Sequence, residues 1–270
     1  MKILDRISVI LFNLCLLLLA VLLPVLCIAS SPAYYQARFR ETGIYSSVED
    51  GVTYRKLIRF VGGDPTQSAT FSDEQIDEII NHMVAFFFQK KADFALTMDG
   101  VVLNGQITDD VAVFGEVACK HMQDVKDLFG LLTVVSVISA VICIACIVYF
   151  CKRPKRFFAL LHKYTIGFYL FFAGFILLFC GWTLCTLPDM GSIDKSLALF
   201  PDMLWTNLHQ IFFFFSPEDI SGSFFNDTVT MVLTLDFFMT TVFIILAILA
   251  VIVASWLVIT TLLKKKYLKY

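Results

Sequence analysis

Four long apolar runs, separated by polar connections, dominate the pattern of this 270-residue chain. About 20 helical residues are needed to cross the roughly 30 Å hydrocarbon core of a bilayer, and each run reaches that length. None of the four contains an ionisable side chain other than cysteine or tyrosine. The runs are residues 7–29, 128–150, 164–187 and 237–263. This pattern predicts four membrane-spanning helices.

The composition agrees with a membrane protein. Hydrophobic residues make up 58% of the chain and charged residues only 16%, whereas soluble domains average about 25% charged residues. The deficit is explained if much of the surface faces hydrocarbon. Basic and acidic residues are nearly balanced, at 21 and 23, so the chain lacks the basic surface of a nucleic-acid binder and we expect no nucleic-acid partner.

Lysine and arginine gather on one set of connections, which predicts the orientation in the cell membrane. They cluster before the first run, between the second and third, and after the fourth, and Asp5 is the only acid in these three segments. We therefore expect both termini to be cytoplasmic and the two acid-containing connections to be extracytoplasmic. The first run exceeds the 7–15 residues of a signal-peptide core, so we expect a retained anchor.

These assignments define the predicted organisation. The segments are 1–29, the N-terminal tail and first span; 30–127, the first extracytoplasmic cap segment; 128–150, the second span; 151–163, a cytoplasmic loop; 164–187, the third span; 188–236, the second cap segment; 237–263, the fourth span; and 264–270, a cytoplasmic tail. The predicted fold class is a mainly α, polytopic membrane protein with a small extracytoplasmic α+β cap.

Short motifs predict local structure in the first cap segment. Ser72 and Gln75 form a capping-box pattern at the start of an amphipathic helix over 73–91. The dipeptide Asp99-Gly100 lies between two apolar stretches and predicts a two-residue β-hairpin. Asp109 and Asp110 then suit the start of a second helix, which we expect to continue without a break into the second span.

The cysteines do not predict a redox or metal centre. Of the eight, only Cys119 lies well inside an external segment, so no external disulfide framework is expected. Cys143 and Cys146 form a CxxC pattern, but within the second span. We interpret them as small packing residues, and we predict no bound metal.

Two of the four histidines are candidates for chemistry. His162 falls in the predicted cytoplasmic loop, and His82 falls on the polar face of its helix, so we expect His82 to be a solvated surface residue. His121 lies about 10 Å before the second span at 1.5 Å per residue, near the depth of a lipid ester. Asp124 follows at i+3, where it could orient the imidazole. His209 lies in an aromatic stretch that is typical of the headgroup region.

The common catalytic signatures are absent from the sequence. It contains no GxSxG nucleophile elbow, no HExxH zinc helix and no glycine-rich phosphate loop. We therefore expect no nucleotide cofactor. From these residues alone, the chain could be a histidine-dependent enzyme or a non-enzymatic four-span accessory or scaffold protein.

The surroundings of the two histidines resemble those of a known family. FGEVACKHMQDVK, residues 114–126, resembles the "F…E…HMxDVK" motif of the lipoprotein intramolecular transacylases, and LHQIFF, residues 208–213, resembles their "FHxIFF" motif. Asp227, followed by Phe237 and Phe238, is similar to their "D…LP..FF" entry to the last span. The chain departs from the family pattern at Thr234, where a proline is usual. Between the second histidine motif and the aspartate, it also has residues 216–225 where the family has an asparagine and a tryptophan.

The resemblance implies a reaction and a set of residues. The family is one of four-span membrane enzymes that move the sn-2 acyl chain of a diacylglyceryl-modified lipoprotein cysteine to its own α-amino group. It implies His121 and His209 as catalytic residues, with diacylglyceryl lipoprotein and membrane lipid as partners and no cofactor. The supporting residues would be Glu116, Asp124, Lys126 and Asp227.

Overall fold

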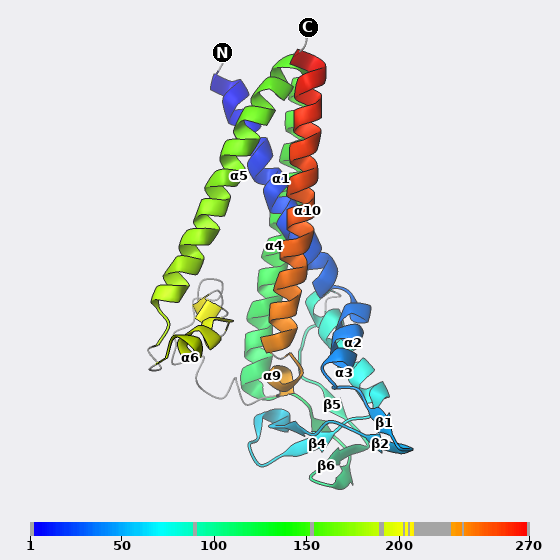
Figure 1. Ribbon diagram of the computed structural model, residues 1–270. Coiled ribbons are helices and arrows are strands. Elements are labelled where there is room, and N and C mark those ends of the chain that lie inside the picture. The colour runs from blue at the N-terminus through cyan, green and yellow to red at the C-terminus, as the bar shows by residue number, and fades with distance from the viewer. Residues whose placement is uncertain are drawn as a thin grey trace. The chain divides into compact units, whose positions relative to one another are not determined.

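The chain forms two compact units in a computed structural model (Figure 1). The structure describes residues 3–88, 91–151, 154–188, 192–201, 203–204, 206–207, 228–233 and 235–268. Unit 1 comprises Met1–Leu26, Leu131–Leu204 and Thr241–Tyr270, and unit 2 comprises Cys27–Gly130 and Trp205–Thr240. Three of the long helices therefore contribute residues to both units.

The four predicted spans are confirmed as long apolar helices. They are α1 (Ile3–Ala29), α4 (Glu116–Phe150), α5 (Pro154–Cys185) and α10 (Leu235–Leu268), and all four are long and apolar enough to cross a membrane. As predicted, α4 runs without a break from the first cap segment into the second span. The short helix α6 (Ile193–Ala198) also belongs to unit 1.

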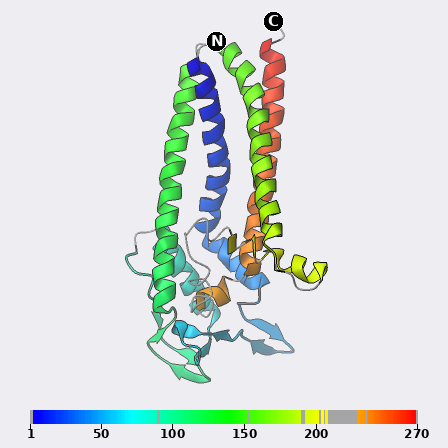
Figure 2. The ribbon, with the colours of Figure 1, turned by 90° about the vertical axis from the view of Figure 1, so that its left-hand side faces the viewer.

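Unit 1 is held together by apolar and a few polar contacts between its helices. Figure 2 shows α1 beside α4, and the thiol of Cys146 lies 3.5 Å from the carbonyl oxygen of Ser8 on α1. Cys143 and Cys146 are free and buried in this core, which confirms the packing interpretation of the CxxC pattern. Asn13 on α1 accepts a 2.7 Å hydrogen bond from the hydroxyl of Thr165 on α5, which pairs two buried polar groups.

Unit 2 combines short helices with three small antiparallel sheets. Its helices are α2 (Pro32–Glu41), α3 (Asp73–Phe88), α9 (Thr228–Val232) and the 3₁₀ turn η1 (Val61–Gly63). The strands are β1 (Ser47–Glu49), β2 (Val52–Tyr54), β3 (Ile58–Arg59), β4 (Ser68–Thr70), β5 (Thr97–Met98), β6 (Val101–Leu103), β7 (Gln106–Thr108) and β8 (Val111–Ala112). The sheet orders are β1-β2, β3-β4-β6-β7 and β5-β8. The predicted α+β cap is confirmed in its fold class.

The amphipathic helix α3 begins as predicted but ends earlier. The Ser72 hydroxyl accepts from the Gln75 amide at 3.2 Å, and the Gln75 side chain accepts from the Ser72 amide at 2.8 Å, so the capping box is formed. The described helix ends at Phe88, and Lys91 lies outside it. The predicted boundary at residue 91 is therefore wrong. The apolar face enters the unit 2 core with Ile76, Ile79, Ile80, Met83 and Phe87.

The predicted hairpin at Asp99-Gly100 is also wrong. The strand before it, β5, pairs with β8, while β6 pairs with β4 and β7. The two-residue hairpin turn is instead Asn104-Gly105, where both residues have positive φ, at 49° and 83°. That combination is typical of a type I′ turn, whose twist matches the strands.

The acids near this turn stabilise loops rather than starting a helix. Asp109 accepts the Gly100 amide at 2.9 Å, and Asp99 accepts the Asp110 amide at 2.8 Å. These two bonds tie the β5–β6 connection to the β7–β8 connection. Residues 111–112 form a strand, and α4 begins only at Glu116. The expectation that Asp109 and Asp110 open the helix is wrong, because the Asp109 carboxylate accepts the Gly100 amide and the Asp110 amide donates to the Asp99 carboxylate.

Phe94 lies at the centre of an aromatic cluster in the unit 2 core. Its side chain is 1% exposed, and its ring centroid lies 4.4 Å from that of Phe114 and 5.1 Å from that of Phe86. Aromatic pairs at such distances contribute beyond their buried area. The cluster therefore joins the loop after α3 to the segment that leads into α4.

We expect Phe94→Ala to lower the free energy of unfolding by about 3–5 kcal/mol, because it removes a large buried ring and leaves a cavity. The measurement is detergent-induced unfolding of the purified protein. Ile107→Ala is the control, since this side chain is 79% exposed, and it should change stability by less than about 0.5 kcal/mol. Equal effects of the two substitutions would contradict this assignment of the core.

Candidate active site

His121 lies in the first part of α4, within unit 2. The α4 helix starts at Glu116, so His121 is in its second turn. The residue is 9% exposed, and its helix neighbours Ala118 and Met122 belong to the unit 2 core. The sequence-predicted histidine is thus a buried group within unit 2.

The acidic residues near His121 on α4 are more exposed. Glu116 forms an ion pair with Lys120 at 2.6 Å, and both side chains are largely solvated. Solvated i,i+4 pairs of this kind contribute little to stability. Asp124 is exposed, whereas His121 is buried. The supporting roles of Glu116 and Asp124 stay predictions.

Lys126 ties α4 to the end of α3. Its ammonium group donates a hydrogen bond to the main-chain carbonyl of Lys91, and it lies 4.2 Å from the ring centroid of Phe86. A cation over an aromatic face adds about 0.5–1 kcal/mol at an exposed site. Lys126 therefore connects α4, which carries His121, to the C-terminal end of α3 and the residue that follows it.

The second predicted histidine, His209, and the predicted supporting residue Asp227 lie outside the described residues. The described residues that flank them are buried: Asn207 is 5% exposed and Thr228 is fully buried. Both belong to unit 2, as His121 does. Thr228 begins α9, whose Val229 and Val232 are part of the same core. Asn207, directly before the second histidine motif, is therefore buried in the unit that holds His121.

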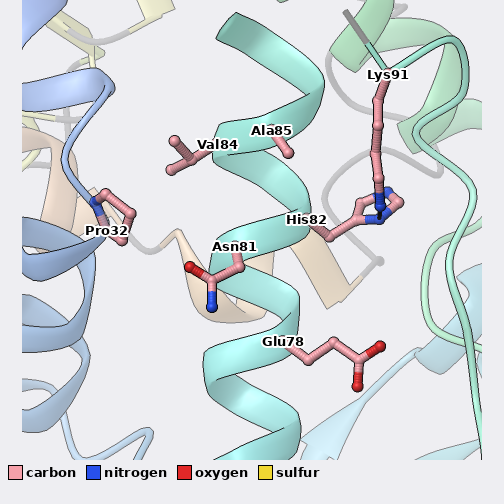
Figure 3. A pocket seen from close by; sticks show the side chains of 7 residues that line it. All are labelled: Pro32, Glu78, Asn81, His82, Val84, Ala85 and Lys91. Atoms are coloured by element: carbon pink, nitrogen blue, oxygen red, sulfur yellow. Dashed lines mark hydrogen bonds between the residues drawn. The ribbon is translucent and has the colours of Figure 1, made fainter. Parts of the chain in front are cut away.

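His82 differs from the sequence expectation. It was expected on the solvated face of its helix, but it is only 6% exposed. One ring nitrogen, Nε2, lies 2.9 Å from the carbonyl oxygen of Phe94, and Nδ1 lies 2.9 Å from the ammonium of Lys91 (Figure 3). The loop after α3 folds back over the polar face and covers the ring. Helical periodicity within α3 gave no signal of this cover.

These two contacts define the state of the His82 ring. The Phe94 carbonyl accepts a hydrogen bond, so Nε2 carries the proton, and Nδ1 is left to accept from Lys91. Burial lowers the pKa of His82, and the nearby Lys91 ammonium lowers it further; the Phe94 carbonyl, Asp93 and Glu78 act in the opposite direction. The ring is therefore neutral at physiological pH.

The lowered pKa of His82 predicts a loss of stability at acidic pH. The unfolded imidazole titrates near about 6.5, so below that pH the unfolded chain binds more protons than the folded one. The stability contribution is fully present above about pH 6.5 and falls as the pH drops towards the folded-state pKa. The thermal unfolding midpoint of wild type should decrease between about pH 7.5 and pH 5.5, and that decrease should be smaller in His82→Gln. A variant with the wild-type pH slope would contradict this assignment.

Arg38 is a buried charge that sequence reasoning did not single out. Its side chain is 11% exposed, with one guanidinium nitrogen 3.2 Å from a carboxylate oxygen of Asp236 and another bonded to Glu41. The contact with Asp236 joins α2 to the start of α10. The sequence offered no signal for it, because the partners are 198 positions apart.

Among the described residues, the candidate site contains a buried histidine but no group of metal-binding side chains. Within the described ranges, His, Cys, Asp and Glu side chains do not gather in groups of three that could hold an ion. A neutral or protonated imidazole can act as a general acid or base without a metal. The fold and this residue together define a polytopic membrane protein with a buried histidine in its α+β unit.

Comparison with known proteins identifies the family. The model of the family "Lipoprotein intramolecular transacylase Lit" matches residues 9–238, so the chain belongs to the lipoprotein intramolecular transacylase family. A solved structure of the membrane integral lipoprotein intramolecular transacylase Lit from Bacillus cereus has a similar fold, with a TM-score of 0.51 and 14% sequence identity. The similarity covers 98% of this chain and 96% of that one. No curated protein sequence matches the chain.

Family membership decides between the two functional classes left open by the residues. The chain is an acyltransferase, a multi-pass membrane enzyme of the intramolecular transacylase class. The alternative of a non-enzymatic accessory or scaffold protein is not supported. The resemblance seen in residues 114–126 and 208–213 is confirmed at the level of the family.

Proposed function

We propose that His121 and His209 are the acid–base pair of this transacylase. The reaction moves the sn-2 acyl chain of a diacylglyceryl-modified lipoprotein cysteine to the α-amino group of the same cysteine. The observation that carries the proposal is the buried position of His121 within unit 2, in the segment that matches the family's first histidine motif. The buried flank residue Asn207, two positions before His209 and in the same unit, supports a shared site.

The chemistry suits two imidazoles. The neutral amine attacks the ester carbonyl, a carbon–nitrogen bond forms, and the bond from the acyl carbon to the glyceryl oxygen breaks. One proton leaves the nitrogen and one reaches the departing oxygen, so the reaction needs no external proton source. An imidazole with a pKa of about 6.5 can take the first proton while a second imidazolium supplies the other.

No activated donor is needed, because the acyl chain moves from an ester to a more stable amide. The main task of the protein is to hold the two ends of one substrate together. Such orientation can lower the barrier by up to about 7–11 kcal/mol. Burial of His121 supports a site from which water is excluded. Excluding water also protects the ester of the substrate from hydrolysis.

The distribution of basic residues supports an orientation with both termini cytoplasmic and unit 2 extracytoplasmic. The segments flanking the apolar helices carry lysine or arginine before α1, around the α4–α5 connection and at the end of α10. In this orientation the lipid-modified cysteine of an exported lipoprotein lies on the same side as His121. A C-terminal reporter active only in the cytoplasm tests it, and activity of a reporter that works only outside would contradict it.

A crossover experiment tests whether the transfer is intramolecular. The purified enzyme is mixed with two diacylated lipopeptides of different peptide sequence, one of which carries deuterated acyl chains. We expect each N-acylated product to keep the isotope of its own starting lipid. Products with a deuterated amide on the unlabelled peptide would contradict intramolecular transfer, although they would still show acyltransferase activity.

A further inference from the structure

A polar pocket beside α3 lies outside the proposed histidine pair. Its volume is about 310 Å³, and Figure 3 shows Pro32 on one side of α3 and Lys91 on the other. Three exposed polar side chains line it, Glu78, Asn81 and Lys91, together with the buried His82. We propose that this pocket binds the headgroup of a zwitterionic aminophospholipid, with the phosphate at Lys91 and the ammonium at Glu78.

The Lys91 ammonium is held in a fixed place at the wall of the pocket. Its contact with Nδ1 of the buried His82 uses one of its three N–H donors. The described residues provide no further acceptor for the other two. His82 cannot swing away, because its second ring nitrogen is bonded to the Phe94 carbonyl. The pocket therefore presents a positioned cation, which suits a phosphodiester oxygen.

Glu78 and Asn81 complete the polar lining. Both side chains are exposed, and neither has a hydrogen-bond partner among the residues that the structure describes. The Glu78 carboxylate accepts hydrogen bonds only, so it suits a ligand ammonium, whereas the Asn81 amide both donates and accepts. The ligand that satisfies all three groups carries an anion and a primary ammonium close together.

The depth of the pocket matches the membrane interface. Pro32 begins α2 shortly after α1 ends at Ala29. At the C-terminal end of α3, the ring centroids of Phe87 and Phe88 lie 5.4 and 5.2 Å from that of Phe129. Phe129 is at the start of the predicted second span. The C-terminal end of α3 is therefore at the level where α4 enters its apolar run. Headgroups are present at that level.

The order of the charges also matches a headgroup. Lys91 is hydrogen-bonded to His82, and Glu78 lies four residues before His82 on α3. At 1.5 Å per residue, Glu78 is therefore about 6 Å farther along the helix from the apolar boundary than the Lys91 contact is. In an aminophospholipid the phosphate is attached to the glycerol and the ammonium lies beyond it, towards water. An anionic headgroup without an ammonium leaves Glu78 without a partner and places like charges together.

Native mass spectrometry of the full-length protein tests this site. The purified protein is mixed with equal amounts of phosphatidylethanolamine and phosphatidylglycerol, and the retained lipids are counted. Wild type should retain phosphatidylethanolamine in preference. Lys91→Gln should weaken retention of both lipids by about tenfold, since a charge-assisted hydrogen bond is lost. Glu78→Gln should abolish the preference between them.

The matched controls are Lys56→Gln and Glu49→Gln, which remove exposed charges of the same sign elsewhere in unit 2. Both should behave as wild type. Unchanged retention and preference in the two pocket variants would overturn the proposal, as would an equal loss in the controls. Binding of the peptide part of a lipopeptide that depends on Lys91, with lipid retention unaffected, would also overturn it. The readout is lipid retention, so it is independent of the proposed catalytic pair.

Discussion

Replacing His121 with alanine is expected to lower the rate of acyl transfer by about 10²–10⁴-fold, the usual contribution of a general acid or base. The imidazole is buried on α4, so no bulk-water group takes over its proton transfer efficiently. The measurement is initial rate with a synthetic diacylated lipopeptide in detergent or proteoliposomes. His121→Gln should lose as much activity, because the amide cannot exchange protons near neutral pH.

His162→Ala is the matched control for this prediction. It removes a histidine from α5 in unit 1, outside the proposed site, and should leave the rate within about twofold of wild type because it touches no reacting group. Thermal unfolding of each variant separates loss of chemistry from loss of fold. A His121→Gln protein that folds normally and keeps the wild-type rate would exclude His121 as a catalytic residue.

Replacing His209 with alanine should cause a loss of similar size, again about 10²–10⁴-fold. If one imidazole acts as base and the other as acid, the wild-type rate depends on pH as a bell, and each histidine controls one limb. The variant should therefore lose one limb of the bell while keeping the other. A merely structural residue would lower the whole curve without changing its shape.

Combining the two substitutions distinguishes a shared site from two separate roles. Residues that act as a unit are strongly non-additive, so the double variant His121→Ala/His209→Ala should be little worse than either single variant. Losses that multiply in the double variant would mean that the two histidines act in independent steps. That outcome would contradict an acid–base pair.

The sequence predicted the spans well because their signal is local. Four apolar runs of membrane-spanning length suffice, and each appears as a long helix. The capping box at Ser72 and Gln75 is similarly local, since both partners lie within one turn. The helical continuity of α4 through His121 follows from the same kind of pattern.

The errors arose where distant segments meet. Asp99-Gly100 has the composition of a hairpin turn, but β5 pairs with β8 instead, through contacts that no short window contains. His82 lies in register with polar neighbours, yet the returning loop that carries Phe94 and Lys91 buries it. The ion pair between Arg38 and Asp236 joins opposite ends of the chain. The spacing of polar and apolar residues within one helix carries no information about contacts with segments that are distant in the sequence.

The candidate site was predicted from local sequence signals. His121 was singled out by its depth before the second span and by Asp124 at i+3, its sequence context resembles a family motif, and the structure adds its burial. The catalytic roles of His121 and His209 and the supporting roles of Glu116, Asp124, Lys126 and Asp227 stay predictions. For Lys126 the structure indicates a contribution to packing through Phe86 and Lys91.

The most direct test is mass spectrometry of the N-terminal lipopeptide of a diacylated reporter lipoprotein. The reporter is expressed in a host that lacks other N-acylating enzymes, with and without this protein. With the protein present, we predict unchanged total mass, one acyl chain on the α-amino nitrogen and one on the glyceryl group. A peptide that stays diacylglyceryl-modified with a free amine, although the protein is confirmed in the membrane, would contradict the transacylase account.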